Sequence, residues 1–263
     1  MDLGIRGKIA LVTGGSSGIG LAAAVALARE GAQIVLASRA QDRLDRAASR
    51  LCAEGAEGVT TRVVDVSDLD ALQRCVEEVV AAHDGVDILI NNAGGPAPGP
   101  LKKLGRDAWE SAWRLSLMSV VEASRAVLPE MTAKGWGRIV NITSVVAKEP
   151  SAVMVLSATY RAGVMALTKA VAGEVAGAGV TVNAVCPSAV LTDRARQLIS
   201  AGADQDGRSF DDALAQVIES LPMKRFAREE EIGDLVAYLC SRQAAYVTGR
   251  SISIDGGSSK SFL

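Results

Sequence analysis

The sequence of 263 residues lacks the patterns that mark several functional classes. Its four cysteines form no C-x-x-C pair and have no histidine at metal-ligand spacing, which predicts buried free thiols in a reducing compartment and no metal site. There are 28 basic and 30 acidic residues and no basic block, so neither nucleic acid nor a membrane surface is expected as a partner. No apolar run reaches the roughly 18 residues that span a bilayer, and no long apolar segment opens the chain. We therefore expect a cytoplasmic protein.

What the chain does have is a composition that can form a core and one glycine cluster. Hydrophobic residues make up 49% of the sequence, enough for one large α/β domain that needs neither metal nor disulfides. The stretch IALVTGGSSGIG, residues 9–20, runs from an apolar strand pattern through glycines into an alanine-rich helical pattern. Glycines at such a turn allow a pyrophosphate to approach the backbone at the N-terminus of a helix. We expect a dinucleotide to bind at Gly14, Ser16, Ser17, Gly18, Ile19 and Gly20.

Strand and helix patterns alternate after this turn. Helical patterns cover residues 19–29, 41–53, 69–82, 109–131, 157–176 and 229–240, and the longest, at 109–131, is broken near Pro129. Strand patterns cover residues 33–37, 59–64, 88–90, 137–143, 180–186 and 251–254. This alternation favours a parallel sheet covered by helices on both faces. The single histidine, His83, lies at the end of one of these helices, and we interpret it as a surface residue.

The segment between the last two strands has a different character. Residues 188–222 contain no strand pattern, a loose stretch at 200–207, and short helical patterns near 194–199 and 210–221. A long segment of this kind in a compact domain is usually a lid or is partly disordered. We expect a lid over the substrate.

Two strand ends indicate how the cofactor binds. After the second strand stands Arg39, where an acidic residue would bind a ribose 2′-hydroxyl and an arginine can accept a 2′-phosphate. Arg39 without an acid beside it favours NADP(H), the alternative being an exposed arginine that begins the next helix. The segment INNAGGPAPGPL follows the strand at 88–90, and the carboxyl end of such a strand is where a parallel sheet places its ligand. Asn91 to Gly94 are therefore expected near the ribose of the cofactor.

Several motifs in the right order resemble the short-chain dehydrogenase/reductase family. They span residues 8–257 and comprise the TGGSSGIG turn, Asp65-Val66, Asn91-Asn92-Ala93-Gly94, Asn141-Ile142-Thr143-Ser144, Asn183 before Pro187, and Asp255-Gly256-Gly257. The resemblance implies a single-domain Rossmann fold, doubly wound around a seven-stranded parallel sheet, that usually assembles as a homotetramer. It also implies cofactor contacts: Asp65 and Val66 at the adenine, Asn91, Ala93 and Gly94 along the cleft, and Pro187 followed by Thr192 at the nicotinamide carboxamide.

The catalytic positions depart from this family. Its members transfer hydride between a nicotinamide and a carbonyl or alcohol with an asparagine, a serine, a tyrosine and a lysine four residues after the tyrosine. Ser144 keeps the serine, whereas Ser116, Ser157 and Arg161 stand at the other three positions. A phenol near pKa 10 needs a neighbouring cation to act as a general acid near neutral pH, and Ser157 has no phenol. Arg161 has the charge and the donors to hold ribose hydroxyls but does not shuttle protons.

Tyr160 is the candidate substitute for the missing phenol. Placing it at the tyrosine position would put Val164 at the lysine position, so this register supplies no cation. Tyr160 could still reach the site from one helical turn further along, beside Arg161. The alternative is that Tyr160 packs against a neighbouring helix in a subunit interface.

These observations lead to one main hypothesis and two alternatives. The expected pocket walls are apolar and suit a small hydrophobic carbonyl or acyl substrate such as a 3-oxoacyl thioester, the alternative being that they are ordinary core residues. They are Val145, Val146, Met154, Val155, Ala189, Val190 and Leu191. We predict an NADP(H)-dependent oxidoreductase with an atypical active site, assembled as a homotetramer or dimer. One alternative is an inactive subunit or cofactor sensor in a hetero-oligomer with an active paralogue. The other is a non-redox dehydratase or isomerase on the same scaffold.

Overall fold

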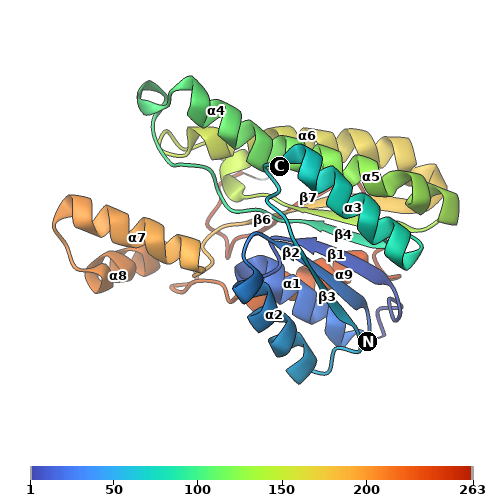
Figure 1. The fold of residues 1–263 in the computed structure, drawn as a ribbon. Helices are drawn as coiled ribbons and strands as arrows, with labels where there is room; N and C mark the ends of the chain where they lie inside the picture. The colour runs from blue at the N-terminus through green and yellow to red at the C-terminus, as the bar shows by residue number, and fades with distance from the viewer. Residues whose placement is uncertain (1, 262–263) are drawn as a thin grey trace.

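The computed structural model describes residues 2–261, which form one parallel sheet with helices on both faces (Figure 1). The sheet order within these residues is β3-β2-β1-β4-β5-β6-β7. The strands are β1 (Ile9–Thr13), β2 (Gln33–Ser38), β3 (Val59–Val63), β4 (Ile88–Asn91), β5 (Gly137–Ile142), β6 (Val180–Pro187) and β7 (Ser251–Ile254). The chain changes direction across the sheet between β1 and β4, which are neighbours, and such a switch point is where an open sheet binds its ligand. The predicted doubly wound, seven-stranded fold is confirmed.

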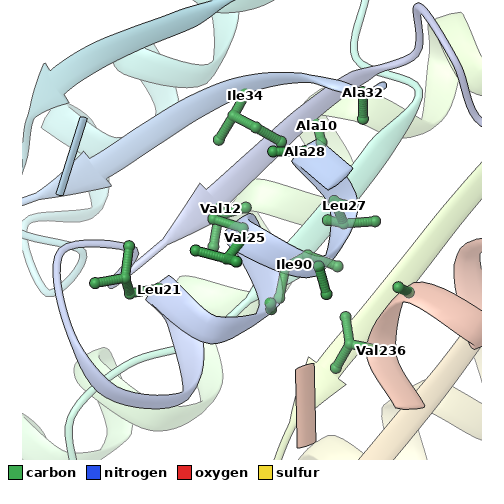
Figure 2. Packing of buried hydrophobic residues seen from close by; sticks show 14 of the residues in the cluster. Ala10, Val12, Leu21, Val25, Leu27, Ala28, Ala32, Ile34, Ile90 and Val236 are labelled. Carbon is green, nitrogen blue, oxygen red and sulfur yellow. The ribbon is translucent and has the colours of Figure 1, made fainter. Parts of the chain in front are cut away.

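Two sets of helices cover the two faces of the sheet. One set is α1 (Gly18–Arg29), α2 (Gln41–Ala53) and α9 (Glu229–Cys240); the other is α3 (Leu69–His83), α5 (Ser119–Lys134) and α6 (Val155–Val175) (Figure 1). Successive strand residues point to opposite faces, so Ala10 and Val12 join the core beneath α1 and α9, while Leu11 joins the core beneath α3 and α5. Figure 2 shows the first of these cores, where Val25 of α1 and Val236 of α9 lie close to the β1 and β4 side chains.

Helices α1 and α9 approach each other closely because Gly233 has no side chain. A Cβ atom on Gly233 would lie 2.5 Å from the main-chain oxygen of Ala22, so only glycine permits this packing. The facing side of α1 is formed by small, fully buried residues such as Ala23 and Ala24. The glycine-rich loop is therefore attached to a helix that is fixed by α9.

The long helix between β4 and β5 differs from its prediction. It consists of α4 (Arg106–Trp113), a π-helical turn, η2 (Arg114–Met118), and α5. Pro129 does not break the helix. A proline leaves the carbonyl four residues earlier, here that of Arg125, without its usual N–H donor. Arg125 and Pro129 are both exposed on the outer side of α5, where water can satisfy that carbonyl. The irregularity lies instead at the π turn, a feature that is often found at functional sites.

The segment after β6 forms two helices, α7 (Asp193–Asp206) and α8 (Phe210–Ser220). The predicted loose stretch at 200–207 is wrong, because α7 continues to Asp206 and ends at Gly207, which adopts a left-handed conformation with φ 63°. Both helices extend away from the sheet (Figure 1). Their function as a lid stays a prediction.

The cysteines are free within the described residues. Cys75, Cys186 and Cys240 are buried, but Cys52 is exposed on α2, so the expectation that all four thiols are buried was wrong for Cys52. Cys52 occupies the water-facing side of an amphipathic helix whose buried residues are Leu44, Ala47 and Leu51. No helix in residues 2–261 is long and apolar enough to cross a membrane.

Candidate active site

The glycine-rich loop is packed so tightly that side chains are excluded from it. A Cβ atom on Gly20 would lie 2.4 Å from the main-chain oxygen of Gly14 and 2.6 Å from the side-chain nitrogen of Asn92. That nitrogen donates a hydrogen bond to the oxygen of Gly14 at 3.1 Å, so Asn92, the residue after β4, holds the loop in place. Ser17 precedes α1 and its hydroxyl makes no capping hydrogen bond. The first N–H groups of α1 are therefore available to a phosphate group.

A group of polar and charged side chains lies at the carboxyl ends of β2 and β3. The hydroxyls of Ser16 and Ser38 are 2.8 Å apart. Arg39 is exposed, and its Nη1 lies 3.7 Å from Oδ2 of Asp65. Partial burial disfavours the charged form of Asp65, but hydrogen bonds from Ser67 and the charge of Arg39 outweigh this effect and lower its pKa. The structure thus brings together the residues that were predicted to bind the adenosine end of the cofactor.

A chain of buried amides lies below the loop that follows β4. The Asn91 side chain donates to Oδ1 of Asn141 at 2.8 Å, and Asn141 donates to Oγ1 of Thr168 at 2.9 Å. These bonds connect β4, β5 and α6, so they fix the positions of three elements that surround the site. The sequence indicates Asn91 and Asn141 as motif residues, and the Leu167-Thr168 step supports the register that puts Arg161 at the lysine position, but it does not predict that Thr168 bonds to Asn141.

Arg161 is the central cation of the site. Its Nη1 donates to the main-chain oxygens of Ile142 at 3.1 Å and Thr143 at 2.5 Å, at the carboxyl end of β5. Burial lowers the pKa of Arg161 to about 10, an effect that the nearby Cys186 thiol only partly opposes, and within the described residues the guanidinium forms no ion pair with a carboxylate. At neutral pH the guanidinium is nevertheless charged, because this value lies well above 7.

Arg161 and Ser116 line the same small cavity. It measures about 20 Å³ and is also lined by Asn91, Ala93 and Gly94. Nε of Arg161 and Oγ of Ser116 are both buried and without a hydrogen-bond partner within residues 2–261. Buried polar groups in a native fold normally have partners, so this pair of groups is suited to a ligand or a water molecule.

The remaining catalytic candidates are placed differently. Ser144 follows β5, and its hydroxyl accepts a hydrogen bond from the Val146 nitrogen at 3.3 Å. Ser157 is buried in the first turn of α6. Tyr160 donates its phenolic hydrogen to the main-chain oxygen of Trp109 at 3.1 Å, and the two rings meet edge to face at 5.8 Å. Burial raises the pKa of Tyr160, and the residue does not line the cavity that contains Arg161. The structure thus brings Ser116 and Arg161 together and directs Tyr160 toward α4 of its own chain.

Thr192, in the segment that follows β6, packs against the glycine-rich loop. It caps α7, since its hydroxyl accepts a hydrogen bond from the Ala195 nitrogen at 3.2 Å. Its methyl group lies 3.5 Å from where a Cβ atom of Gly18 would be. Pro187 ends β6 at the same edge of the sheet. Thr192 therefore lies at the cleft, as the prediction of a cofactor contact requires.

Comparison with known proteins identifies the group to which the chain belongs. Residues 14–259 match the family described as enoyl-(acyl carrier protein) reductase. The chain belongs to the short-chain dehydrogenase/reductase family. It is 36% identical over 252 residues to nodulation protein G of Azospirillum brasilense, covering 95% of this chain and 97% of that protein. It is 33% identical to the 3-oxoacyl-[acyl-carrier-protein] reductase of Thermotoga maritima over 254 residues, or 96% and 98% of the two chains.

Solved structures of this family show the same architecture. L-sorbose reductase from Gluconobacter frateurii, in complex with NADPH and L-sorbose, matches with a TM-score of 0.94 and 35% identity, over 99% of this chain and 100% of that one. A variant of actinorhodin polyketide ketoreductase with NADPH matches with a TM-score of 0.92 and 33% identity, over 97% and 98%. As a member of the short-chain dehydrogenase/reductase family, the chain is an oxidoreductase.

The residues present fit a nicotinamide dinucleotide. The cradle at Gly20 has no room for a side chain, and the first N–H groups of α1 are free to bind a phosphate. At the other end of the cleft, Nε of Arg161 and Oγ of Ser116 are unpaired donors of the kind that ribose hydroxyls can satisfy.

Proposed function

We propose that the chain is an NADP(H)-dependent reductase or dehydrogenase that acts on a hydrophobic carbonyl or alcohol through an atypical active site. The observation that carries this proposal is the buried guanidinium of Arg161 beside the cofactor cleft. Its Nη1 is bonded to two main-chain oxygens, but its Nε has no hydrogen-bond partner within the described residues. A buried charge without a counter-ion is unfavourable for folding, so a ligand that satisfies it gives a reason for its presence. The similar reductases that contain NADPH support the choice of cofactor.

Each end of the cofactor has its own residues in this proposal. Gly18 and Ile19 present main-chain N–H groups to the pyrophosphate, Arg39 binds the 2′-phosphate, and Asp65 lies at the adenine. Arg161 holds the ribose of the nicotinamide, which supplies or accepts the hydride when bound. Thr192 contacts the nicotinamide carboxamide.

The proton donor is the unusual part of the site. Ser144 donates a hydrogen bond to the substrate oxygen, and Arg161 stabilises negative charge near it without giving up a proton. Ser157 has no phenol, and the Tyr160 hydroxyl is bonded to Trp109. The proton then comes from water, and the absence of a positioned general acid slows the reaction by about 10²- to 10⁴-fold.

The substrate enters beside Ser144 and Ser157 in this proposal. Half-buried apolar residues of the kind that hold an acyl chain, Val145, Val146, Met154, Val155, Ala189 and Leu191, lie around that point. A 3-oxoacyl thioester fits such walls, and the Thermotoga maritima relative carries that substrate in its name. Helices α7 and α8, within the predicted lid at 188–222, close over it.

Calorimetric titration with NADP⁺ and with NAD⁺ tests the cofactor assignment without knowledge of the substrate. We expect the wild type to prefer NADP⁺, and Arg39→Ala to lose about tenfold or more in affinity for NADP⁺ with little change for NAD⁺. Arg43→Ala, which removes an exposed arginine one turn further on, is the matched control. Equal binding of both nucleotides by the wild type contradicts the role of Arg39, and binding of neither contradicts the reductase proposal.

A second candidate is favoured by the changed catalytic positions and by the bond between Tyr160 and Trp109. In this case the chain is an inactive subunit or cofactor sensor, either as a homotetramer or dimer or in a hetero-oligomer with an active paralogue. NADP⁺ binding without NADPH oxidation by any carbonyl in a panel of 3-oxoacyl thioesters, ketones and ketoses supports it. Product formation without cofactor consumption indicates a non-redox dehydratase or isomerase. Light scattering on the purified protein gives the size of the assembly.

A further inference from the structure

Three consecutive glutamates open α9, and two of them have basic partners. Glu231 receives hydrogen bonds from both terminal nitrogens of Arg225 at 2.8 Å and from the Arg228 main chain at 2.8 Å. Glu230 lies 3.8 Å from Nη2 of Arg50. Glu229 has neither a hydrogen bond to its carboxylate nor an ion pair within the described residues. Its carboxylate is the one of the three that lacks a basic partner.

Glu229 lies beside the glycine-rich loop. Its Oε1 is 3.8 Å from where a Cβ atom of Gly18 would be, and Gly18 is the first residue of α1. The Thr192 methyl group contacts the same point from the start of α7. Glu229 is half-buried there, between the first turns of α1, α7 and α9. These contacts put a carboxylate next to the helix terminus that serves a phosphate.

The charges around Glu229 are mostly of its own sign. Burial, followed by the carboxylates of Glu230 and Asp193, raises the pKa of Glu229, and the charge of Arg50 on α2 acts in the opposite direction. This imbalance exists before any ligand enters. The pyrophosphate of a dinucleotide brings further negative charge to the loop, which disfavours the ionised carboxylate still more.

We propose that Glu229 takes up a proton when the pyrophosphate of the cofactor binds, so that affinity for the cofactor falls as the pH rises. The inference rests on the proposed binding of NADP(H) in the glycine-rich loop. Binding is tightest at a pH where Glu229 is already protonated in the free protein. The affinity for the cofactor falls as the pH rises from the pKa of Glu229 in the free protein to its higher pKa in the complex. Above both pKa values the affinity no longer depends on the ionisation of Glu229. Each unit between them corresponds to about a tenfold change in affinity.

Two glutamine variants separate this effect from a general change of charge. Glu229→Gln removes the carboxylate beside Gly18, and Glu230→Gln removes one charge from the next residue, whose carboxylate is exposed and faces Arg50. NADP⁺ is titrated calorimetrically into each protein at about pH 5.5 and about pH 8. Each titration is repeated in two buffers of different ionisation enthalpy, which gives the number of protons taken up. The 2′-phosphate of the nucleotide also titrates near pH 6, so the difference between proteins is the relevant quantity.

We expect Glu229→Gln to bind NADP⁺ about tenfold more tightly than the wild type at pH 8, with a smaller difference at pH 5.5 and fewer protons taken up. Glu230→Gln should remain within about twofold of the wild type, because Arg50 offsets part of its charge. Equal affinities and equal proton uptake in the wild type and Glu229→Gln overturn the inference while leaving the cofactor proposal intact. Absence of NADP⁺ binding by the wild type overturns both. Asp193→Asn is the second variant. It removes a charge that raises the pKa of Glu229, so its affinity for NADP⁺ should begin to fall at a lower pH than that of the wild type.

Discussion

Arg161→Met should abolish tight cofactor binding while leaving the stability of the free protein nearly unchanged. Within residues 2–261 the guanidinium is buried without a carboxylate counter-ion, and burial lowers its pKa from 12.5 to about 10. At about 1.4 kcal/mol per pKa unit, this burial destabilises the charged form by about 3.5 kcal/mol at neutral pH. The two hydrogen bonds to Ile142 and Thr143 contribute about the same amount in the opposite direction. A methionine of similar length should therefore change the free energy of unfolding by less than about 1 kcal/mol.

The same change removes the donors offered to the ribose, so the affinity for NADP⁺ should fall about 10- to 100-fold. Urea unfolding gives the stability and calorimetric titration gives the affinity. Arg138→Met is a matched control. Arg138 is also buried, its Nη1 donates to the main-chain oxygens of Gly137 and Gly179, and its Nε has no hydrogen-bond partner within the described residues. Unlike Arg161, it lies at the amino end of β5, away from the proposed cofactor site. That variant should keep its affinity. A loss of more than about 3 kcal/mol in Arg161→Met with unchanged affinity would refute the reasoning, since Arg161 would then be a structural residue.

Three further changes test other parts of the structure. Gly20→Ala should reduce NADP⁺ binding beyond detection, because the new Cβ would lie 2.4 Å from the main-chain oxygen of Gly14. Gly202→Ala is the control, since Gly202 lies in α7 with open space around it. This variant should bind NADP⁺ normally and gain about 0.5–1 kcal/mol of stability. Tyr160→Phe should retain the turnover of the wild type, and a fall of about 10²-fold or more would identify Tyr160 as the proton donor after all. Hydrogen bonds from Arg225, then from Arg228, lower the pKa of Glu231 to about 2. Glu231→Gln should therefore be less stable than the wild type at neutral pH. Acid unfolding should show this difference in stability disappearing as the pH falls from about 4.5 toward 2.

The fold could be predicted because its signals are local. Apolar strands alternate with amphipathic helices, and the bounds of α2, α9 and β7 follow from hydrophobic spacing and glycine positions alone. The π turn could not be predicted, because nothing in the spacing of residues 109–131 marks one extra residue in a turn. The effect of Pro129 depends on whether water reaches its side of the helix, and that is a property of the tertiary structure.

The site was predictable in its membership and less so in its geometry. Glycine, Arg39 and Asp65 carry their chemistry in their residue types, so their grouping follows from topology. The orientation of Tyr160 depends on Trp109, which is 51 positions away in the sequence. Glu229 was missed because a glutamate at the start of a helix is ordinarily explained by the helix dipole, and only the fold brings it against Gly18.

The close contact between α1 and α9 also determines when the chain can complete its fold during synthesis. The ribosome makes α1 long before the helix that covers its alanine-rich side, which begins at Glu229. Until then, the small apolar residues of α1 that meet Gly233 lack this partner. Unfinished chains with such exposed surfaces are prone to aggregate. A nascent chain that stops before α9 should therefore depend on chaperones, however complete its nucleotide-binding motif is.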